Sequence, residues 1–314
     1  MTLRHSTIRQ LQVFVEAAET LSFARVAERL GLTPAAVSFQ IKQIEGLCGF
    51  ALFERVGRRV VLTEAGAALV EYAAVVLKAL GDADERLREM KGLSGGHARI
   101  GLVSTAKYIM PLMLARFQAT YPRIAIHLQE GNRRDIIAAL LKGDIDIAVM
   151  GKPPEDADVA AEPFAPHPSV LIAPPGHRLA GGGPLPLTAL SEERFIVRED
   201  GSGTRALMEN FFQGGGFSPR IVLTSSSNET IKQAVMAGMG IALISRHTIQ
   251  LELRMGLLTT LPAEGLPLMR SWFVANRRHM PLLPVHTQLR RFLLAEGKSL
   301  IDGIERDYGA VERR

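Results

Sequence analysis

The sequence is poor in cysteine and in long apolar runs. Cys48 is the single cysteine among 314 residues, so no disulfide can form within the chain, as is typical of a protein that folds in a reducing compartment. We expect an unreactive thiol at Cys48, because the residues around it are apolar. No apolar run approaches the roughly 18 residues that a membrane span needs. These absences exclude a disulfide-stapled domain and predict a cytoplasmic protein without a membrane helix.

The features of secreted proteins and of common enzymes are also missing. The first residues, MTLRHSTIRQL, lead straight into an amphipathic helical pattern, without the charged, apolar and cleavage segments of a secretory signal. We find no metal-binding His/Cys spacing, no nucleophile elbow and no glycine-rich dinucleotide fingerprint. His167 and His177 stand alone in Pro-rich strand and loop segments, where we expect surface side chains rather than catalysts. The sequence therefore predicts no enzyme activity, no metal site and no cofactor.

The length and the charge distribution indicate two folded units and an anionic partner. A chain of 314 residues exceeds what one compact core usually fills. Its composition, 47% hydrophobic and 22% charged, is that of an ordinary globular protein. Residues 1–62 carry eight Lys and Arg against five Glu, and so hold +3 of the net charge of +5. A basic excess gathered in the N-terminal fifth of the chain is typical of a phosphate-binding module.

The first 48 residues contain the signals of three helices with a tight turn between the second and the third. Apolar residues over 8–18 recur at three- and four-residue steps, which predicts a helix with one buried face. Ser22 is placed to cap a second helix that ends at Gly31, and Thr33 with Pro34 to open a third. This is the helix-turn-helix pattern, in which the second of the paired helices enters a DNA major groove. A plain three-helix core is the alternative.

A basic hairpin and the outward face of the third helix complete the predicted DNA-binding surface. Residues 50–62 contain two β-prone runs around a basic tip, and we interpret them as a wing. Three arginines within five residues favour contact with phosphates or a minor groove over an ordinary solvated turn. The residues predicted to contact DNA are Thr33, Pro34, Ala35, Ser38, Phe39 and Lys42 on the helix, and Arg55, Arg58 and Arg59 in the wing.

A long amphipathic helix is predicted over residues 63–91. Its apolar stripe follows three-four spacing for three heptads, and GLSGG then breaks it. A stripe of this length has no partner within its own small domain, so we expect it to pair with the same helix of a second subunit. Dimerisation suits DNA binding, because two half-sites multiply a weak single-module affinity. The stripe consists of Leu69, Tyr72, Val76, Ala79, Ala83, Leu87 and Met90.

After this helix, strand-like and helix-like segments alternate in two sets. The alternation predicts a parallel α/β sheet in each of two lobes, with a cleft between them. The first set has strands at 98–103, 123–130 and 144–151, and the second has strands at 169–175, 194–199, 220–226 and 240–245. The predicted domains are the DNA-binding domain (1–62), the linker and dimerisation helix (63–91), a hinge (92–97), the two-lobed domain (98–300) and a C-terminal tail (301–314).

The turns that follow these strands predict a small-molecule site. Ligands of open α/β sheets bind at the carboxyl ends of strands, and the turns there carry hydroxyls and basic side chains that, with helix N-termini, make anion sites. Any one turn could be an ordinary helix cap, but five together favour a polar, anion-binding cleft. The predicted hydroxyl ligands are Ser104, Thr105, Ser202, Thr204 and Ser226, and the predicted cations are Lys107, Arg134, Lys152 and Arg205.

Two long segments resemble a known family. SFARVAERLGLTPAAVSFQIKQIE followed by LFERVGRRVVLTEAG resembles the DNA-binding signature of the LysR-type transcriptional regulators. VSTAKYIMP, GNRRDI, DIDIAVMGKPP, REDGSGTRALMENFF and SNETIKQAVMAGMGIALIS resemble the CbbR group of that family, which controls carbon-dioxide-fixation operons. The resemblance covers nearly the whole chain. It implies an all-α winged helix-turn-helix, a long linker helix and an α/β two-lobed effector domain with a periplasmic-binding-protein-like fold.

The resemblance also implies an assembly, an effector and partners. We expect a homotetramer, a dimer of dimers, that binds promoter DNA and RNA polymerase and responds to a phosphorylated metabolite or nucleotide, such as ribulose 1,5-bisphosphate, phosphoenolpyruvate, ATP or NADPH. Many members have Arg where this chain has Phe39, so we expect an apolar contact there, for example with a thymine methyl. The family's DNA contacts fall on Pro34, Ala35, Ser38, Phe39 and Arg55, and its effector cleft falls on Ser104, Thr105, Asn132, Gly151, Ser202, Gly203, Thr204 and Ser226.

Two alternatives stay open at this point. The first is a LysR-type regulator of another pathway, such as aromatic or amino-acid metabolism. The second is an enzyme built on the two-lobed domain, which a turnover assay would reveal.

Overall fold

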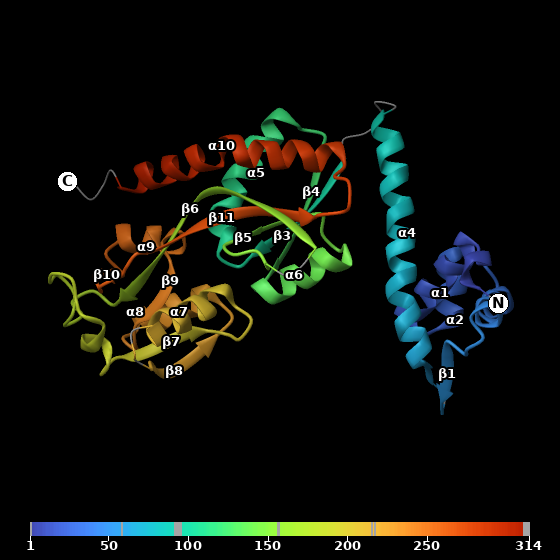
Figure 1. Ribbon diagram of the computed structural model, residues 1–314, viewed down its shortest axis with the longest axis horizontal. Helices are drawn as coiled ribbons and strands as arrows, with labels where there is room; N and C mark the ends of the chain where they lie inside the picture. Colours follow the sequence, from blue (N-terminus) through green and yellow to red (C-terminus); the bar gives the residue numbers. More distant parts are fainter. Residues whose placement is uncertain are drawn as a thin grey trace. The chain divides into compact units, whose positions relative to one another are not determined.

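The computed structural model describes residues 2–57, 59–90, 96–155, 158–214, 216 and 218–309. The chain divides into two compact units, residues 1–92 and residues 93–314. The division falls within the predicted hinge, of which residues 92–95 lie outside the described ranges. Figure 1 shows the helical N-terminal unit with its hairpin and the mixed α/β C-terminal unit. The predicted fold class is confirmed.

Capping residues determine where the N-terminal helices begin and end. After a short 3-10 helix, η1(Leu3–His5), the helices are α1(Ile8–Thr20), α2(Phe23–Leu30) and α3(Pro34–Cys48). Ser22 accepts the N–H of Arg25 at the start of α2, and Gly31 ends that helix in the left-handed conformation with φ +63°. Thr33 accepts the N–H of Ala36 at the start of α3. The helix-turn-helix therefore follows from local hydrogen bonds that the sequence already indicates.

A hairpin and a long helix complete the N-terminal unit. β1(Phe53–Val56) pairs antiparallel with β2(Arg59–Leu62), and Arg55 lies opposite Val60. The helix α4(Glu64–Met90) follows directly. Phe14, Val26, Val37 and other side chains from α1, α2 and α3 form one buried cluster, and the first turns of α4 close it.

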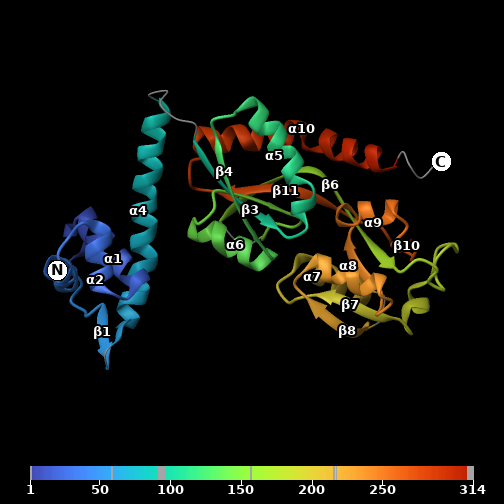
Figure 2. The same ribbon diagram turned by 180° about the vertical axis from the view of Figure 1, so that it is seen from behind.

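The first lobe of the C-terminal unit is a parallel sheet covered by helices. β3(His97–Val103) lies between β4(Ala125–Gly131) and β5(Ile147–Met150), parallel to both. A 3-10 turn, η2(Ala106–Tyr108), leads into α5(Met110–Thr120), while α6(Arg133–Lys142) follows β4. α10(Pro284–Gly309) packs against α5 and against the strand β6(Val159–Ala173) (Figure 2). It extends past the tail boundary predicted at residue 300, and Ile301 is buried in the lobe's core.

The second lobe is built around a smaller set of strands. β7(Arg194–Arg198) pairs parallel with β8(Arg220–Ser225), and β9(Ala242–Ser245) pairs with β6. The helices α7(Gly203–Gly214), α8(Asn228–Met236) and α9(Gln250–Arg254) follow these strands, together with η3(Leu187–Leu190), η4(Arg246–Thr248) and β10(Thr259–Leu261). Two apolar clusters form the core of this lobe.

Two long antiparallel strands connect the lobes, and of these the sequence-based prediction of separate parallel sheets included only the segment 169–175. β6(Val159–Ala173) and β11(Leu268–Arg277) pair along nearly their whole length. They place β10, β6, β11, β5, β3 and β4 in one seven-stranded sheet, with β9 on β6. Pro163, Pro166 and Pro168 obscure β6 in the sequence, because proline is expected at strand edges rather than in a central strand.

The described part of the chain contains no helix that is both long enough and apolar enough to span a bilayer.

Candidate functional site

The outward face of α3 is exposed as predicted. Phe39 is 59% exposed, Ser38 is half-buried and Lys42 is exposed, whereas Val37 and Ile41 face the core. Phe39 therefore gives this face one large, mostly exposed apolar group among small side chains. Thr33, Pro34 and Ala35 are exposed at the start of the same helix.

The hairpin carries exposed positive charge. Arg55 in β1 and Arg59 in β2 are both exposed, and Arg58 lies outside the described residues. Arg55, Arg59 and Lys42 form no ion pair with any residue in the described ranges. Their charges are therefore available to an anionic partner.

The helix α4 has two apolar faces. Leu69 packs against the core of its own unit, together with Ala73 and Leu77, so this part of the predicted stripe is already covered. Tyr72 is 74% exposed and Val76 is 43% exposed. Ala79, Ala83 and Leu87 are exposed as well, and the side chain of Met90 lies outside the described set. An apolar strip of α4, which consists of Tyr72, Val76, Ala79, Ala83 and Leu87, is therefore exposed in the described part of the N-terminal unit.

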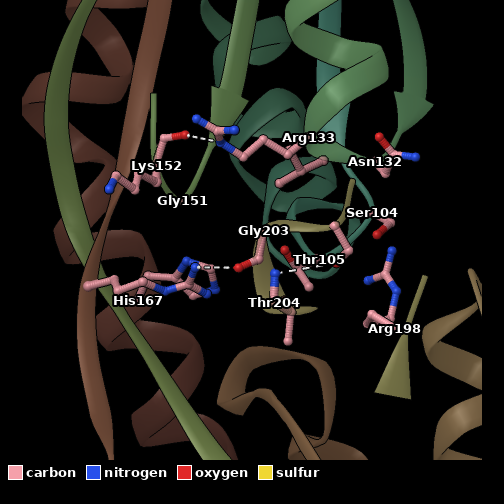
Figure 3. A pocket seen from close by; sticks show the side chains of 13 residues that line it. Ser104, Thr105, Asn132, Arg133, Gly151, Lys152, His167, Arg198, Gly203 and Thr204 are labelled. Atoms are coloured by element: carbon pink, nitrogen blue, oxygen red, sulfur yellow. Dashed lines mark hydrogen bonds between the residues drawn. The ribbon is translucent and has the colours of Figure 1, made fainter. Parts of the chain in front are cut away.

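A polar cleft lies between the two lobes of the C-terminal unit (Figure 3). Residues from the ends of β3, β4, β5 and β7 line it, together with side chains from the connecting strands β6 and β11. The structure brings eight of the predicted effector residues to this cleft: Ser104, Thr105, Asn132, Gly151, Lys152, Ser202, Gly203 and Thr204.

Four other predicted effector residues do not line the cleft. Lys107 pairs with Glu130 at 3.2 Å, and Arg205 pairs with Glu209 one turn along α7. Arg134 pairs with Asp200 at 2.7 Å, where both side chains are largely exposed. Ser226 is exposed at the end of β8. In this structure three of these cations turn toward nearby carboxylates instead of the cleft, so an effector contact by these four residues stays a prediction.

Three other arginines supply the positive charge of the cleft. Arg133 donates from Nε to the carbonyl of Lys152 at 2.7 Å. Arg198 is 3% exposed at the end of β7, and its guanidinium donates to Asn228 Oδ1 at 2.8 Å and to Glu199. Arg270 comes from β11. Arg133 directly follows the predicted site residue Asn132, and Arg198 lies in the strand predicted at 194–199, whereas Arg270 lies in a strand that the alternation pattern did not reveal.

His167 is buried rather than at the surface, so its sequence-based interpretation was wrong. It is 1% exposed, and its ring stacks on Trp272 with ring centroids 3.7 Å apart. Burial, reinforced by the Arg270 cation, holds the pKa of His167 well below its usual range, so the ring is neutral at pH 7. His177 is half-buried and lies 3.3 Å from Glu193, away from the cleft. Strand pairing between β6 and β11, which the sequence did not reveal, draws His167 inward.

The cleft is nearly closed. Its cavity volume is about 20 Å³, which is room for about one water. Hydrogen bonds join the lobes beside it: Asn228 donates to the carbonyl of Ser104 at 3.2 Å, and the Tyr108 hydroxyl donates to Glu229. A ligand the size of a phosphate therefore needs more space than the cavity offers in this structure, so side chains around it must move.

Both units match models of one family. Residues 8–67 match the model described as bacterial regulatory helix-turn-helix protein, lysR family, and residues 91–298 match the LysR substrate binding domain. The HTH-type transcriptional regulator CbbR of Rhodospirillum rubrum is 45% identical over 299 residues, which cover 95% of this chain and 99% of that one. The RuBisCO operon transcriptional regulator of Allochromatium vinosum is 42% identical and covers 93% of this chain and 97% of its own.

A solved structure is similar to the C-terminal unit. The regulatory domain of CcmR from Synechocystis PCC6803, in complex with 2-PG (2-phosphoglycolate), is 38% identical with a TM-score of 0.62. The match covers 64% of this chain and 96% of that domain. The two family models together with these relatives show that the chain is a transcriptional regulator rather than an enzyme, and that it belongs to the LysR family.

Proposed function

We propose that this regulator controls carbon-dioxide-fixation genes, and that a small phosphorylated metabolite bound between the lobes sets its activity. The gene set is supported by the relatives, of which one is a regulator of a RuBisCO operon. The effector class is supported by one observation above all, the convergence of hydroxyls and cations in the cleft. The similar CcmR domain holds a phosphorylated ligand.

The cleft has the donors that a buried phosphate requires. Such an anion must exchange its water for several donors at once. Thr105 and Thr204 are nearly buried, and no hydroxyl of theirs is engaged by another described residue. The first turns of α6 and α7 reach the cleft at Arg133 and Gly203, where the positive ends of the helix dipoles favour negative charge. Lys152, Arg133, Arg198 and Arg270 surround this space.

We infer that effector binding acts on DNA binding by changing the arrangement of the two lobes around the cleft. A ligand shifts a conformational equilibrium only by its differential affinity for the two states. In this structure the lobes touch through Asn228 with Ser104 and through Tyr108 with Glu229, and the cavity admits about one water. A phosphorylated metabolite therefore favours a wider lobe arrangement, which the assembly transmits to DNA.

We further propose a homotetramer in the cytoplasm that binds promoter DNA and engages RNA polymerase. The apolar strip on α4 from Tyr72 to Leu87 would pair with its copy in a second subunit. The exposed face of α3 would enter a major groove, with Phe39 against a thymine methyl, while Arg55 and Arg59 contact phosphates.

Removing one cleft hydroxyl should weaken effector binding. Thr105→Val and Thr204→Val keep the side-chain shape, and each is expected to weaken 2-phosphoglycolate binding about tenfold or more, the usual loss of one hydrogen bond to a charged group. Isothermal calorimetry on the full-length protein measures this. Ser226→Ala is the matched control, because Ser226 is exposed outside the cleft, and its affinity should equal that of the parent. Unchanged affinity in both valine variants would contradict the assignment of the cleft.

Binding to DNA should depend strongly on salt. Each phosphate contact releases counterions, so the affinity for a target promoter should fall at least about tenfold between roughly 50 and 200 mM salt. Arg55→Ala should weaken binding on every sequence and lower the slope of log affinity against log salt by about 1. Lys142→Ala removes a charge from the C-terminal unit and serves as the control. An affinity that does not change with salt concentration would rule out this electrostatic role. An Arg55→Ala variant with the same slope of log affinity against log salt as the parent would rule it out as well.

A further inference from the structure

Both ring nitrogens of His167 are buried without a hydrogen-bond partner among the described residues. A neutral imidazole carries one donor and one acceptor, and a buried polar group left unpaired costs stability. The ring sits on Trp272 with an interplanar angle of 11°, so packing keeps it in place. Gly151 lies beside one edge of the ring, and it has no side chain to cover Nδ1. A Cβ at this position would lie 2.8 Å from Nδ1. These unused groups face the effector cleft (Figure 3).

Arg270 stands beside His167 with an unused donor of its own. The two residues are direct partners across β6 and β11. The terminal nitrogens of Arg270 donate to the carbonyl of Gly203 at 3.4 Å and to Ser169 Oγ at 3.3 Å, whereas its Nε is buried without a described partner. Burial lowers the pKa of Arg270 to about 10, so the guanidinium stays charged at neutral pH. A fixed cation and a neutral imidazole therefore share one wall of the cleft.

The ionisable groups near His167 are basic. Arg270 and His247 oppose its protonation, and His247 on η4 accepts from Trp272 Nε1 at 3.2 Å. Across the cleft stand Lys152, Arg133 and Arg198, the last of which is paired with Glu199. Among the described residues that line the cleft, none is a carboxylate. An anion that enters the cleft would therefore offset the repulsion from these cations, and its contact with the imidazolium would also offset part of the cost of burial, which is the larger cause of the low pKa of His167.

We propose that His167 takes up a proton from solvent when a phosphate dianion enters the cleft, and that His167 with Arg270 selects dianionic effectors over singly charged ones. This inference rests on the proposed effector function. The proton adds to the free ring nitrogen of the imidazole, and the new N–H donates to a phosphate oxygen, while Arg270 Nε donates to the same group. No bond breaks, and one proton leaves the solvent for each ligand bound. A singly charged ligand gains less from the imidazolium, so the site prefers the dianion.

The sign of the pH dependence separates this mechanism from titration of the ligand. The pKa of His167 lies well below its usual range in the free protein and must rise when the dianion binds. Proton uptake then makes binding tighter as pH falls from 8 toward 6.5. A phosphate ester has its own second pKa at about 6. Protonation of the ligand as pH falls removes the preferred dianion, so titration of the ligand alone would make binding weaker at lower pH. Tighter binding at lower pH therefore reports on the protein.

Calorimetry with 2-phosphoglycolate as the probe tests this directly. Titrations of the full-length protein at pH 7.5, in phosphate-free buffers of different ionisation enthalpy, give the number of protons taken up as a slope. We expect uptake approaching one proton for the parent and close to none for His167→Gln and His167→Phe. Both variants should bind about tenfold or more weakly, because a hydrogen bond to a charged group is lost. Thr204→Val is the matched control: it should bind more weakly but keep the parent's proton count.

His167→Phe also distinguishes a binding role from a packing role. The phenyl ring can keep the stack on Trp272 and removes two unpaired buried nitrogens, so its melting temperature should equal or exceed that of the parent. A variant that is as stable as the parent but binds the probe more weakly supports the proposal. Tight binding without proton uptake in the parent, or equal uptake in the parent and in His167→Phe, would overturn the proposed role of His167 and leave the proposed effector function standing. Failure of the parent to bind either 2-phosphoglycolate or inorganic phosphate would overturn the proposed function with it.

Discussion

Val76→Asp is expected to dissociate the subunits that pair through α4 and to weaken promoter binding at least about 100-fold. Val76 lies in the middle of the exposed apolar strip of α4, and a carboxylate buried there without a partner costs several kcal/mol. Loss of pairing also removes the gain from two linked half-sites, which reaches 10²–10⁴ in affinity. Light scattering and promoter binding on the full-length protein measure both effects.

Ala74→Asp is the matched control for this variant. Ala74 is exposed on α4 and lies two residues, about 200° around the helix, from Val76. It adds the same charge to the opposite side, so assembly and DNA binding should stay as in the parent. Val76 is not part of the core, so Val76→Asp should keep the parent's melting temperature within a few degrees. An unchanged assembly state in Val76→Asp would show that the strip is not the interface.

Gly66→Ala should destabilise the N-terminal unit severely. Gly66 lies in the first turn of α4, where a Cβ would stand 2.1 Å from the carbonyl oxygen of Leu52 and 2.9 Å from the Leu62 side chain. A backbone atom cannot move aside as a flexible side chain can, so we expect a loss of about 3 kcal/mol. For a unit of this size, that loss corresponds to a fall of more than about 10 °C in melting temperature.

Scanning calorimetry of the full-length protein tests the expectation, with Gly46→Ala as control. Gly46 lies inside α3, has an ordinary φ and faces open space, so alanine there should stabilise the helix by roughly 0.5–1 kcal/mol. The two variants make the same chemical change with opposite expected signs. Equal melting temperatures for the two would contradict the close approach of α4 to Leu52.

The two expectations address the same helix, α4. Part of α4 is held against its own unit through Gly66, Leu69 and Ala73, while Tyr72 and Val76 are exposed and are the residues that we propose to contact a second subunit. If α4 is packed rigidly against its own N-terminal unit, then pairing of α4 with its copy in a second subunit would fix the distance between the two α3 helices. Half-site spacing on DNA depends on that geometry.

Local signals made the DNA-binding unit predictable from its sequence. Ser22, Gly31 and Thr33 act within three or four residues of themselves, through caps and a left-handed turn, so no distant part of the chain is needed to place them. The strand-to-helix turns of the effector cleft were predictable for a related reason. Each turn directly follows its own strand, and the carboxyl ends of parallel strands meet at one edge of a sheet.

Which charged groups reach the cleft was decided by tertiary structure alone. Arg133 and Arg134 are neighbours at the start of α6, yet only Arg133 faces the cleft, because successive helical residues point about 100° apart and Asp200 of the other lobe attracts Arg134. No local pattern distinguishes the two. Ion pairs with Glu130 and Glu209 likewise hold Lys107 and Arg205 outside.

The sequence by itself determined the family, the helix-turn-helix, the long linker helix and the hydroxyl-rich turns, because caps, periodicity and motifs act over a few residues. Only the tertiary structure decided that His167 and Arg270 meet. They lie more than 100 residues apart, and the antiparallel pairing of β6 with β11 makes them direct partners. Their meeting depends on strand register and on burial behind Trp272, which are properties of the folded sheet rather than of either segment.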